Sequence, residues 1–168
     1  GIRIPKTLIT NDKTSLIEFY ETNNKNVIYK PVLGGASTQK LTYKDLTEER
    51  LNELQESPIQ LQECIDGVDL RVFAMGNNIY PAEIRANTID FRDDKQAELV
   101  PVDIPENIKN DCIKALELFK LKYSGIDIKK TKNNEYIFIE ANPAPMFIHF
   151  ERKTNYPITE ELIKLLTK

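Results

Sequence analysis

The stretch YSGIDIKKTKNNEYIFIEANP, residues 123–143, carries the most specific pattern in this chain. Residues 123–129 and 135–140 are rich in β-branched and aromatic side chains, and the turn-forming residues 132–134 separate them. Two such runs around a short polar turn predict the strands of a β-hairpin. The hairpin is the local unit from which the rest of the sequence can be interpreted.

Three oxygen-bearing side chains lie on this hairpin. Asp127 is in the middle of the first strand, whereas Glu140 and Asn142 end the second strand and share one face because side chains alternate along a strand. With Asp127 opposite, the three side chains suit a hard cation such as Mg²⁺ that keeps several waters and binds phosphate oxygens. Carboxylates are common at strand ends, so on spacing alone a purely structural role is a slightly better interpretation.

The rest of the chain mixes strands and helices in blocks, which favours an α+β fold with antiparallel sheets over a doubly wound parallel one. Hydrophobic periodicity and capping signals predict helices over 12–22, 43–56, 106–119 and 158–166. Strands are predicted over 27–30, 59–65, 69–75 and 78–84, the last three as one antiparallel meander. The polar segment 87–105 shows at most a short strand around 89–91.

A lysine stands where the strand 27–30 ends. Lys30 is followed by the small-residue loop Gly34, Gly35, Ala36 and Ser37. A lysine beside such a loop can neutralise phosphate oxygens while the loop amides approach them closely. The GxxxxGK[ST] pattern of a Walker loop is absent, and in isolation a plain hairpin with a solvated lysine explains these residues better.

A third group surrounds residues 62–69, where a polar turn interrupts an apolar strand. Backbone groups at such an edge can bind adenine, and a carboxylate shortly afterwards can hold ribose hydroxyls. Arginines on or beyond the predicted meander can clamp phosphates through paired N–H donors, the candidates being Arg71, Arg85 and Arg92. Each arginine taken alone is better explained as a surface residue.

Composition narrows the class of protein. The net charge of −3 and the pI near 5.4 disfavour nucleic-acid binding, which needs clustered basic residues on one face. No apolar stretch is long enough for a membrane span, so a cytoplasmic protein with no membrane partner is expected. Cys64 and Cys112 lie far apart in apolar-periodic segments, so two buried thiols are expected and not a disulfide, and no CxxC pattern suggests zinc.

Taken together and in order, these residues resemble the ATP-grasp superfamily through essentially all 168 residues. The most specific part is Ser124-Gly125-Ile126-Asp127 followed by Glu140-x-Asn142-Pro143, which is similar to the superfamily's metal-ligand signature. Within it, the chain is most similar to the RimK-like branch and to the microviridin or graspetide type of peptide maturase. The stretches that carry this likeness are IPKTLITND (4–12), YKPVLGG (29–35), IDFR (89–92), APMF (144–147) and FE (150–151).

The resemblance implies a fold of two small lobes, 1–63 and 64–168, with a nucleotide cleft between them. It also implies a role for each site residue. Lys30, with the loop Gly34, Gly35, Ala36 and Ser37, would contact ATP phosphates, and Arg85 would steady the transferred phosphoryl group. The adenine site would be lined by Gln62, Glu63, Cys64 and Ile65, and Asp69 would bind ribose. Two Mg²⁺ ions, with Mn²⁺ as a further candidate, would be held by Asp127, Glu140 and Asn142.

By the same resemblance, the activity would be ATP-dependent ligation of a carboxylate to an amine or hydroxyl, with a precursor peptide as the expected partner. A further phosphate-binding lysine of the family lies upstream of a segment like 1–10, in or after an N-terminal domain that this sequence lacks, so the chain alone need not be active. The alternatives are an amino-acid ligase acting on a small molecule or protein tail, and a non-catalytic nucleotide-binding fragment. A homo-oligomer is also compatible with the sequence.

Overall fold

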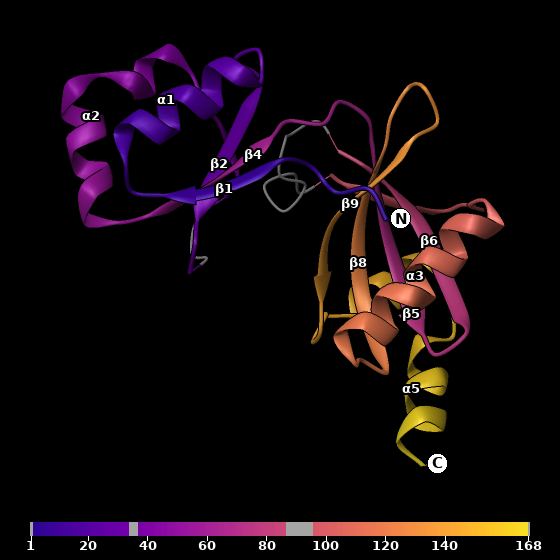
Figure 1. The fold of residues 1–168 in the computed structure, drawn as a ribbon. Coiled ribbons are helices and arrows are strands. Elements are labelled where there is room, and N and C mark those ends of the chain that lie inside the picture. Colours follow the sequence, from indigo (N-terminus) through magenta and orange to yellow (C-terminus); the bar gives the residue numbers. More distant parts are fainter. Residues whose placement is uncertain (1, 34–36, 87–95, 168) are drawn as a thin grey trace. The chain divides into compact units, whose positions relative to one another are not determined.

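The computed structural model describes residues 2–33, 37–86 and 96–167, and these form two compact units. The N-terminal unit comprises residues 5–65. The C-terminal unit comprises residues 66–86 and 96–167, together with residues 2–4. Figure 1 shows the elements of both units, and each unit is described by itself.

The N-terminal unit contains a four-stranded antiparallel sheet in the order β1-β4-β2-β3. Its strands are β1 (Thr7–Thr10), β2 (Val27–Pro31), β3 (Gln39–Lys40) and β4 (Ile59–Glu63). Its helices are α1 (Lys13–Thr22), the 3₁₀ turn η1 (Tyr43–Leu46), α2 (Glu48–Glu53) and the 3₁₀ turn η2 (Leu54–Glu56). The order shows that β4 lies between β1 and β2 although it comes last in the sequence.

One face of this sheet carries the hydrophobic core of the unit. Val27 and Leu61 from the central strands are fully buried against Leu16 and Tyr20 of α1 and Leu51 of α2. The helix α1 begins where expected, because the Asp12 side chain accepts a hydrogen bond from the Ser15 N–H at 2.7 Å. Val27 and Leu61 point toward this core, so the residues that alternate with them along β2 and β4 point to the opposite face of the sheet.

The C-terminal unit is built on a five-stranded antiparallel sheet in the order β7-β6-β5-β8-β9. Its strands are β5 (Val68–Met75), β6 (Asn78–Arg85), β7 (Glu98–Pro101), β8 (Tyr123–Lys130) and β9 (Tyr136–Asn142). Its helices are α3 (Glu106–Phe119), α4 (Ile148–Thr154) and α5 (Ile158–Leu166).

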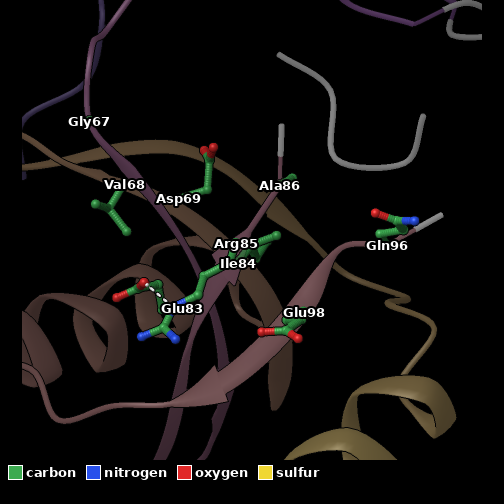
Figure 2. A pocket seen from close by; sticks show the side chains of 9 residues that line it. All are labelled: Gly67, Val68, Asp69, Glu83, Ile84, Arg85, Ala86, Gln96 and Glu98. Atoms are coloured by element: carbon green, nitrogen blue, oxygen red, sulfur yellow. Dashed lines mark hydrogen bonds and ion pairs between the residues drawn. The ribbon is translucent and has the colours of Figure 1, made fainter. Parts of the chain in front are cut away.

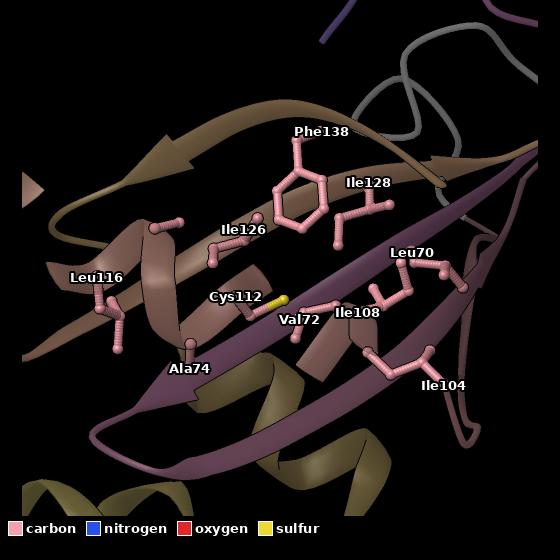
Figure 3. Packing of buried hydrophobic residues seen from close by; sticks show 11 residues of the cluster. Leu70, Val72, Ala74, Ile104, Ile108, Cys112, Leu116, Ile126, Ile128 and Phe138 are labelled. Atoms are coloured by element: carbon pink, nitrogen blue, oxygen red, sulfur yellow. The ribbon is translucent and has the colours of Figure 1, made fainter. Parts of the chain in front are cut away.

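Helices pack on both faces of this second sheet. On one face, α3 packs its apolar stripe, including Ile108 and Cys112, against Val72 and Ile126 of the central strands (Figure 3). On the other face, Phe150 of α4 and Ile158 of α5 pack against a cluster around Phe73. The end of β5 is covered on both faces, and this explains its uninterrupted apolar run Val72–Met75.

Most of the predicted elements are present. The helices predicted to start near residues 12 and 106 and at 158 are confirmed, as are the strand 27–30 and the 123–140 hairpin. The structure additionally contains β1, β3, β7 and α4, for which no element was predicted. The strand expected around 89–91 lies outside the described residues. Within the described part of the chain, no helix has the length and apolar character that a membrane span requires.

Two predictions were wrong. Residues 59–65 do not continue into a three-stranded meander, because β4 pairs with β1 and β2 in the other sheet. Gly67 therefore lies in a connection between strands of different sheets and not in a hairpin turn, and a Cβ there would collide with the Lys130 carbonyl oxygen. The helix predicted over 43–56 is divided into η1, α2 and η2, since Thr47 is extended at the break and caps α2.

Candidate functional site

The register of the β8–β9 hairpin brings the predicted oxygen ligands together. Asp127 is the Cα partner of Glu140, and Asn142 is the partner of Gly125, two residues earlier on β8. Directly opposed residues in an antiparallel pair have Cα atoms about 4.5–5.5 Å apart and share one face of the sheet. A β-bulge follows Asp127, and bulges locally bend a strand. The three side chains expected to hold a cation therefore lie side by side.

Beside these ligands, four charged residues form what we call the charge square: Asp69 and Arg71 on β5, and Asp127 and Lys129 on β8. Arg71 Nε lies 2.8 Å from Asp127 Oδ1, and Lys129 Nζ lies 2.7 Å from Asp69 Oδ2. The side chains are only 18–34% exposed, so both ion pairs are partly shielded from water. The square is neutral overall, and the adjacent Glu140 leaves the local surface with a net negative charge.

Lys129 is the member of the charge square that had no role assigned from the sequence. It stands two residues after Asp127, so strand alternation puts both side chains on one face. Its partner Asp69 lies 60 residues away in the sequence. The pair could be recognised only once β5 was known to pair with β8, because Asp69 and Lys129 are directly opposed in that register.

Backbone packing fixes the end of β9 that carries Asn142. The buried Ser124 hydroxyl donates to the Asn142 carbonyl at 2.8 Å, and Asn142 Oδ1 accepts from the Ala144 N–H at 2.9 Å. A Cβ at Gly125 would lie 2.8 Å from Pro145 and 3.2 Å from an Arg71 nitrogen. Only a residue without a side chain at this position lets Pro145 and Arg71 pack over the strand.

The donor set fits a hard cation that is shared with a ligand. Across residues 2–33, 37–86 and 96–167, no group of three or more His, Cys, Asp or Glu side chains is arranged to hold a metal ion. Asp127 and Glu140 provide two carboxylates, and Asn142 adds an amide oxygen. Mg²⁺ in proteins is commonly bound by one or two carboxylates together with waters and substrate phosphates. This combination therefore suits a metal that binds with its nucleotide and not in a cage made by protein alone.

In the N-terminal unit, Lys30 and Gln62 lie on the face of the sheet opposite its hydrophobic core. Ile28 pairs with Gln62 and Lys30 with Gln60, so the register puts Lys30 and Gln62 on one face of neighbouring strands. The Gln62 side-chain amide donates to the Thr7 hydroxyl at 3.1 Å. Ser37 is partly exposed, whereas the other three residues of the predicted loop, 34–36, lie outside the described residues.

The end of β4 is tied to the turn that precedes β2. The Cys64 N–H donates to the Asn26 carbonyl at 2.9 Å, and the Asn26 side-chain amide donates to the Cys64 carbonyl at 2.8 Å. The Glu63 N–H donates to the Lys6 carbonyl at 2.9 Å on the other side. Both main-chain groups of Cys64 are therefore already used by Asn26.

Arg85 does not join the charge square. It follows Ile84, the register partner of Asp69, and so lies on the other face of the sheet. Its Nε lies 2.8 Å from Glu83 Oε1, and this carboxylate raises the arginine pKa further above its usual value. Figure 2 shows Asp69 directed away from this ion pair. Arg92 lies outside the described residues.

A cavity of about 470 Å³ opens at the same end of the sheet. It is lined by Gly67, Val68, Asp69, Glu83, Ile84, Arg85, Ala86, Gln96 and Glu98 (Figure 2). Five of these side chains carry polar or charged groups, and Asp69 is the one that belongs to the charge square. The cavity therefore links the square to the ends of β6 and β7.

Known proteins have a similar fold and a related sequence. The family model of the RimK-like ATP-grasp domain matches residues 1–166. The ATP-grasp ligase PsnB, solved with a phosphomimetic variant of a minimal precursor, Mg and ADP, is 34% identical with a TM-score of 0.90, over 99% of this chain and 53% of that chain. The macrocyclase MdnC from Microcystis aeruginosa MRC, solved with the precursor peptide MdnA, is 26% identical with a TM-score of 0.85, over 99% of this chain and 56% of that chain.

A similar match is found among curated proteins. The alpha-aminoadipate–LysW ligase LysX of Saccharolobus solfataricus is 28% identical over 177 residues, which cover 98% of this chain and 64% of that protein. The chain thus spans slightly more than half of the two solved relatives and less than two thirds of LysX.

Proposed function

Because the chain belongs to the RimK-like ATP-grasp family, we propose that it is the nucleotide- and metal-binding part of an ATP-dependent ligase that activates a carboxylate. The observation that carries the proposal is the β8–β9 register, which opposes Asp127 to Glu140 and sets Asn142 beside them. These residues supply the oxygen donors that a nucleotide-bound cation requires. The product would be an amide or an ester, depending on the acceptor.

Asp127, Glu140 and Asn142 hold Mg²⁺ in this proposal, with two ions as the expected number and Mn²⁺ as a substitute. Bound Mg²⁺ would neutralise phosphate charge and act as a Lewis acid. Arg71 keeps the Asp127 carboxylate in place through its 2.8 Å contact, so this ligand needs little reorganisation when the metal binds. PsnB was solved with Mg and ADP, which supports the assignment.

In this proposal each group of the nucleotide has its own set of residues. Lys30, with the loop Gly34, Gly35, Ala36 and Ser37, contacts phosphates, and Asp69 accepts hydrogen bonds from ribose. Gln62, Glu63, Cys64 and Ile65 line the adenine. Asn26 uses both main-chain groups of Cys64, and the Glu63 N–H donates to the Lys6 carbonyl, so the backbone contacts to adenine would come from the Glu63 carbonyl and from Ile65.

The reaction has two steps. The γ-phosphoryl group of ATP passes to a substrate carboxylate oxygen and releases ADP, and an amine or hydroxyl then attacks the acyl phosphate, loses a proton and expels phosphate. The protein contributes position and charge, because no covalent nucleophile is required. Arg85 remains the candidate for steadying the transferred phosphoryl group, and it would first have to leave Glu83, to which it is bound at 2.8 Å.

A peptide side chain is the proposed site of ligation. PsnB and MdnC were both solved with precursor peptides, and PsnB shares 34% of aligned residues with this chain. LysX, whose name describes a ligase of alpha-aminoadipate and LysW, is 28% identical and supports the alternative of amino-acid transfer to a small molecule or protein tail. A nucleotide-binding module without turnover is the remaining alternative, since the chain spans only part of each relative.

Calorimetric titration of the chain with AMP-PNP tests the metal assignment. Binding should require MgCl₂, and Glu140→Gln should weaken it by roughly tenfold or more, because one anionic ligand of the cation is lost. Glu117→Gln on α3, an exposed carboxylate away from the charge square, should change nothing. Equal, Mg²⁺-dependent affinities for wild type and Glu140→Gln would rule out Glu140 as a ligand.

Phosphate release separates the ligase from a binding module. The chain, and a longer version that includes sequence equivalent to the rest of its relatives, should release phosphate from ATP only when a carboxylate-bearing peptide is present. A longer version that binds nucleotide but never releases phosphate with such peptides would favour the binding module.

A further inference from the structure

Lys129 and Asp69 form an ion pair that the proposed mechanism does not yet use. Lys129 Nζ lies 2.7 Å from Asp69 Oδ2, and the side chains are 22% and 34% exposed. The two residues are directly opposed on β8 and β5, so the contact follows from the register of two central strands and not from a mobile loop. Asp69 also lines the cavity of about 470 Å³ at the end of the sheet.

We propose that Lys129 is a positioning residue that fixes the Asp69 carboxylate for the ribose hydroxyls of the nucleotide. The inference rests on the proposed function, which assigns ribose to Asp69. A carboxylate has about four lone-pair sites, and a single contact with Lys129 occupies one of them. Both oxygens of Asp69 therefore keep the capacity to accept a hydroxyl, while the carboxylate is held in one orientation.

Charge gives Lys129 a second reason to stand here. A nucleoside triphosphate is strongly anionic, and a bare carboxylate close to it would be repelled. The ammonium group cancels the charge of Asp69 while leaving its hydrogen-bond acceptors available. Lys129 thus lets one acidic side chain recognise a sugar next to phosphates, and selectivity for ribose over sugars without these hydroxyls follows.

The neighbouring Lys130 provides a matched comparison. It follows Lys129 on the same strand, so its side chain points to the other face of the sheet. There its ammonium lies 5.8 Å from the centre of the Tyr136 ring. Lys130→Met therefore removes the same charge from the same strand without touching the Asp69 pair.

The test measures binding of AMP-PNP and of 2′,3′-dideoxy-ATP with Mg²⁺ to wild type, Lys129→Met, Lys129→Arg and Lys130→Met. Lys129→Met should weaken AMP-PNP binding by about fivefold to tenfold, in the range for breaking a partly buried charge pair. Its effect on the dideoxy nucleotide should be smaller, so that discrimination between the two nucleotides falls. Lys129→Arg should keep most of the affinity, and Lys130→Met should match wild type.

A double-mutant cycle with Asp69→Asn isolates the route of action. If Lys129 works through Asp69, Lys129→Met should have less than about a twofold further effect in the Asp69→Asn background. An equal loss in both backgrounds, or for both nucleotides, would overturn the proposal by showing that Lys129 contacts phosphate directly. If Lys129→Met does not fold, as judged by circular dichroism, Lys129→Gln takes its place in the cycle.

These measurements distinguish failure of the proposed function from failure of the role of Lys129. A wild-type chain that binds no nucleotide at any Mg²⁺ concentration would overturn the proposed function and this proposal together. A wild type that binds AMP-PNP, beside a Lys129→Met variant with unchanged affinity and unchanged discrimination, would overturn only the role of Lys129.

Discussion

The two sheets of this protein make side chains available for binding in different ways. The four-stranded sheet has its buried core on one face, and Lys30 and Gln62 stand on the other. The five-stranded sheet has helices packed on both faces, and its charge square stays partly open on the face that α4 and α5 cover around Phe73. Polar side chains opposite a core suit contacts spread along a ligand, whereas a partly covered face suits fixed charges for chemistry.

The largest expected effects come from breaking each core separately. Leu61→Ala in the N-terminal unit and Ile126→Ala in the C-terminal unit each remove a side chain that is at most 1% exposed. Each should lower the free energy of unfolding by about 2–5 kcal/mol. Because the two cores are distinct clusters, hydrogen exchange should show lost amide protection mainly within the unit that carries the substitution.

An exposed leucine provides the control for this experiment. Leu118→Ala on α3, at a side chain that is 66% exposed, should change the free energy of unfolding by less than about 0.5 kcal/mol. If Leu61→Ala instead removed amide protection equally from both units, the two sheets would unfold as one cooperative body. The two units would then have no separate free energies of unfolding.

A smaller effect is expected where Pro145 and Arg71 pack over Gly125 beside the charge square. Gly125→Ala puts a Cβ 2.8 Å from Pro145 and 3.2 Å from Arg71, so one of these neighbours must move. The substitution should cost about 1–3 kcal/mol of stability by overpacking, and should weaken Mg²⁺-dependent AMP-PNP binding because Arg71 holds Asp127. Calorimetric titration and thermal unfolding measure the two effects.

Gly76→Ala separates packing from general loss of stability. Gly76 has a φ of +58° but open space around its Cβ position, so alanine should cost only about 1–2 kcal/mol of backbone strain. Its nucleotide affinity should equal that of wild type, because the β5–β6 turn lies away from the square. Equal loss of binding in both glycine variants would show that stability alone controls affinity.

The sequence was sufficient for features that are local in the chain. The hairpin 123–143 supplies both strands, the turn between them and the opposed Asp127 and Glu140, so spacing and alternation were enough. The ordered set of motifs also predicted the α+β ATP-grasp fold and the RimK-like branch, and the family match and the solved relatives confirm both. Whether the site residues act as predicted stays open to the experiments above.

Long-range pairing explains what the sequence did not reveal. The strand 59–63 has the same apolar pattern as its successors, and only its packing partners assign it to the other sheet. The ion pair of Lys129 with Asp69 depends on a register between strands 60 residues apart. Arg85 is preferred to Arg71 as a phosphate-binding candidate from the sequence, yet strand alternation places them on opposite faces of one sheet.

A modest effect is expected from removing the hydrogen bond between Asn26 and Cys64 at the end of β4. Asn26→Ala removes the side-chain donor to the Cys64 carbonyl at 2.8 Å, and one such hydrogen bond contributes about 0.5–1.5 kcal/mol. Nucleotide affinity should fall by about twofold to tenfold, because the backbone proposed to line adenine becomes less ordered. Asn133→Ala, in the exposed β8–β9 turn, is the control, and equal affinities for both variants would remove Asn26 from the binding site.

The smallest perturbation is chemical labelling of the two thiols, which probes one thiol in each unit without a core substitution. Cys112 lies on the buried face of α3, and burial raises the pKa of its thiol to about 12, so it should stay protonated and unreactive in the native protein at pH 8. Cys64 is partly exposed and should react with Ellman's reagent, and AMP-PNP with Mg²⁺ should slow that reaction if the nucleotide covers the end of β4.

Raising the pH from 7.5 to 9 should still leave Cys112 protected, since its thiolate forms only near pH 12. Rapid labelling of Cys112 in the native Cys64→Ser variant would contradict this expectation. It would mean that α3 separates readily from the sheet and exposes the core of the C-terminal unit to solvent.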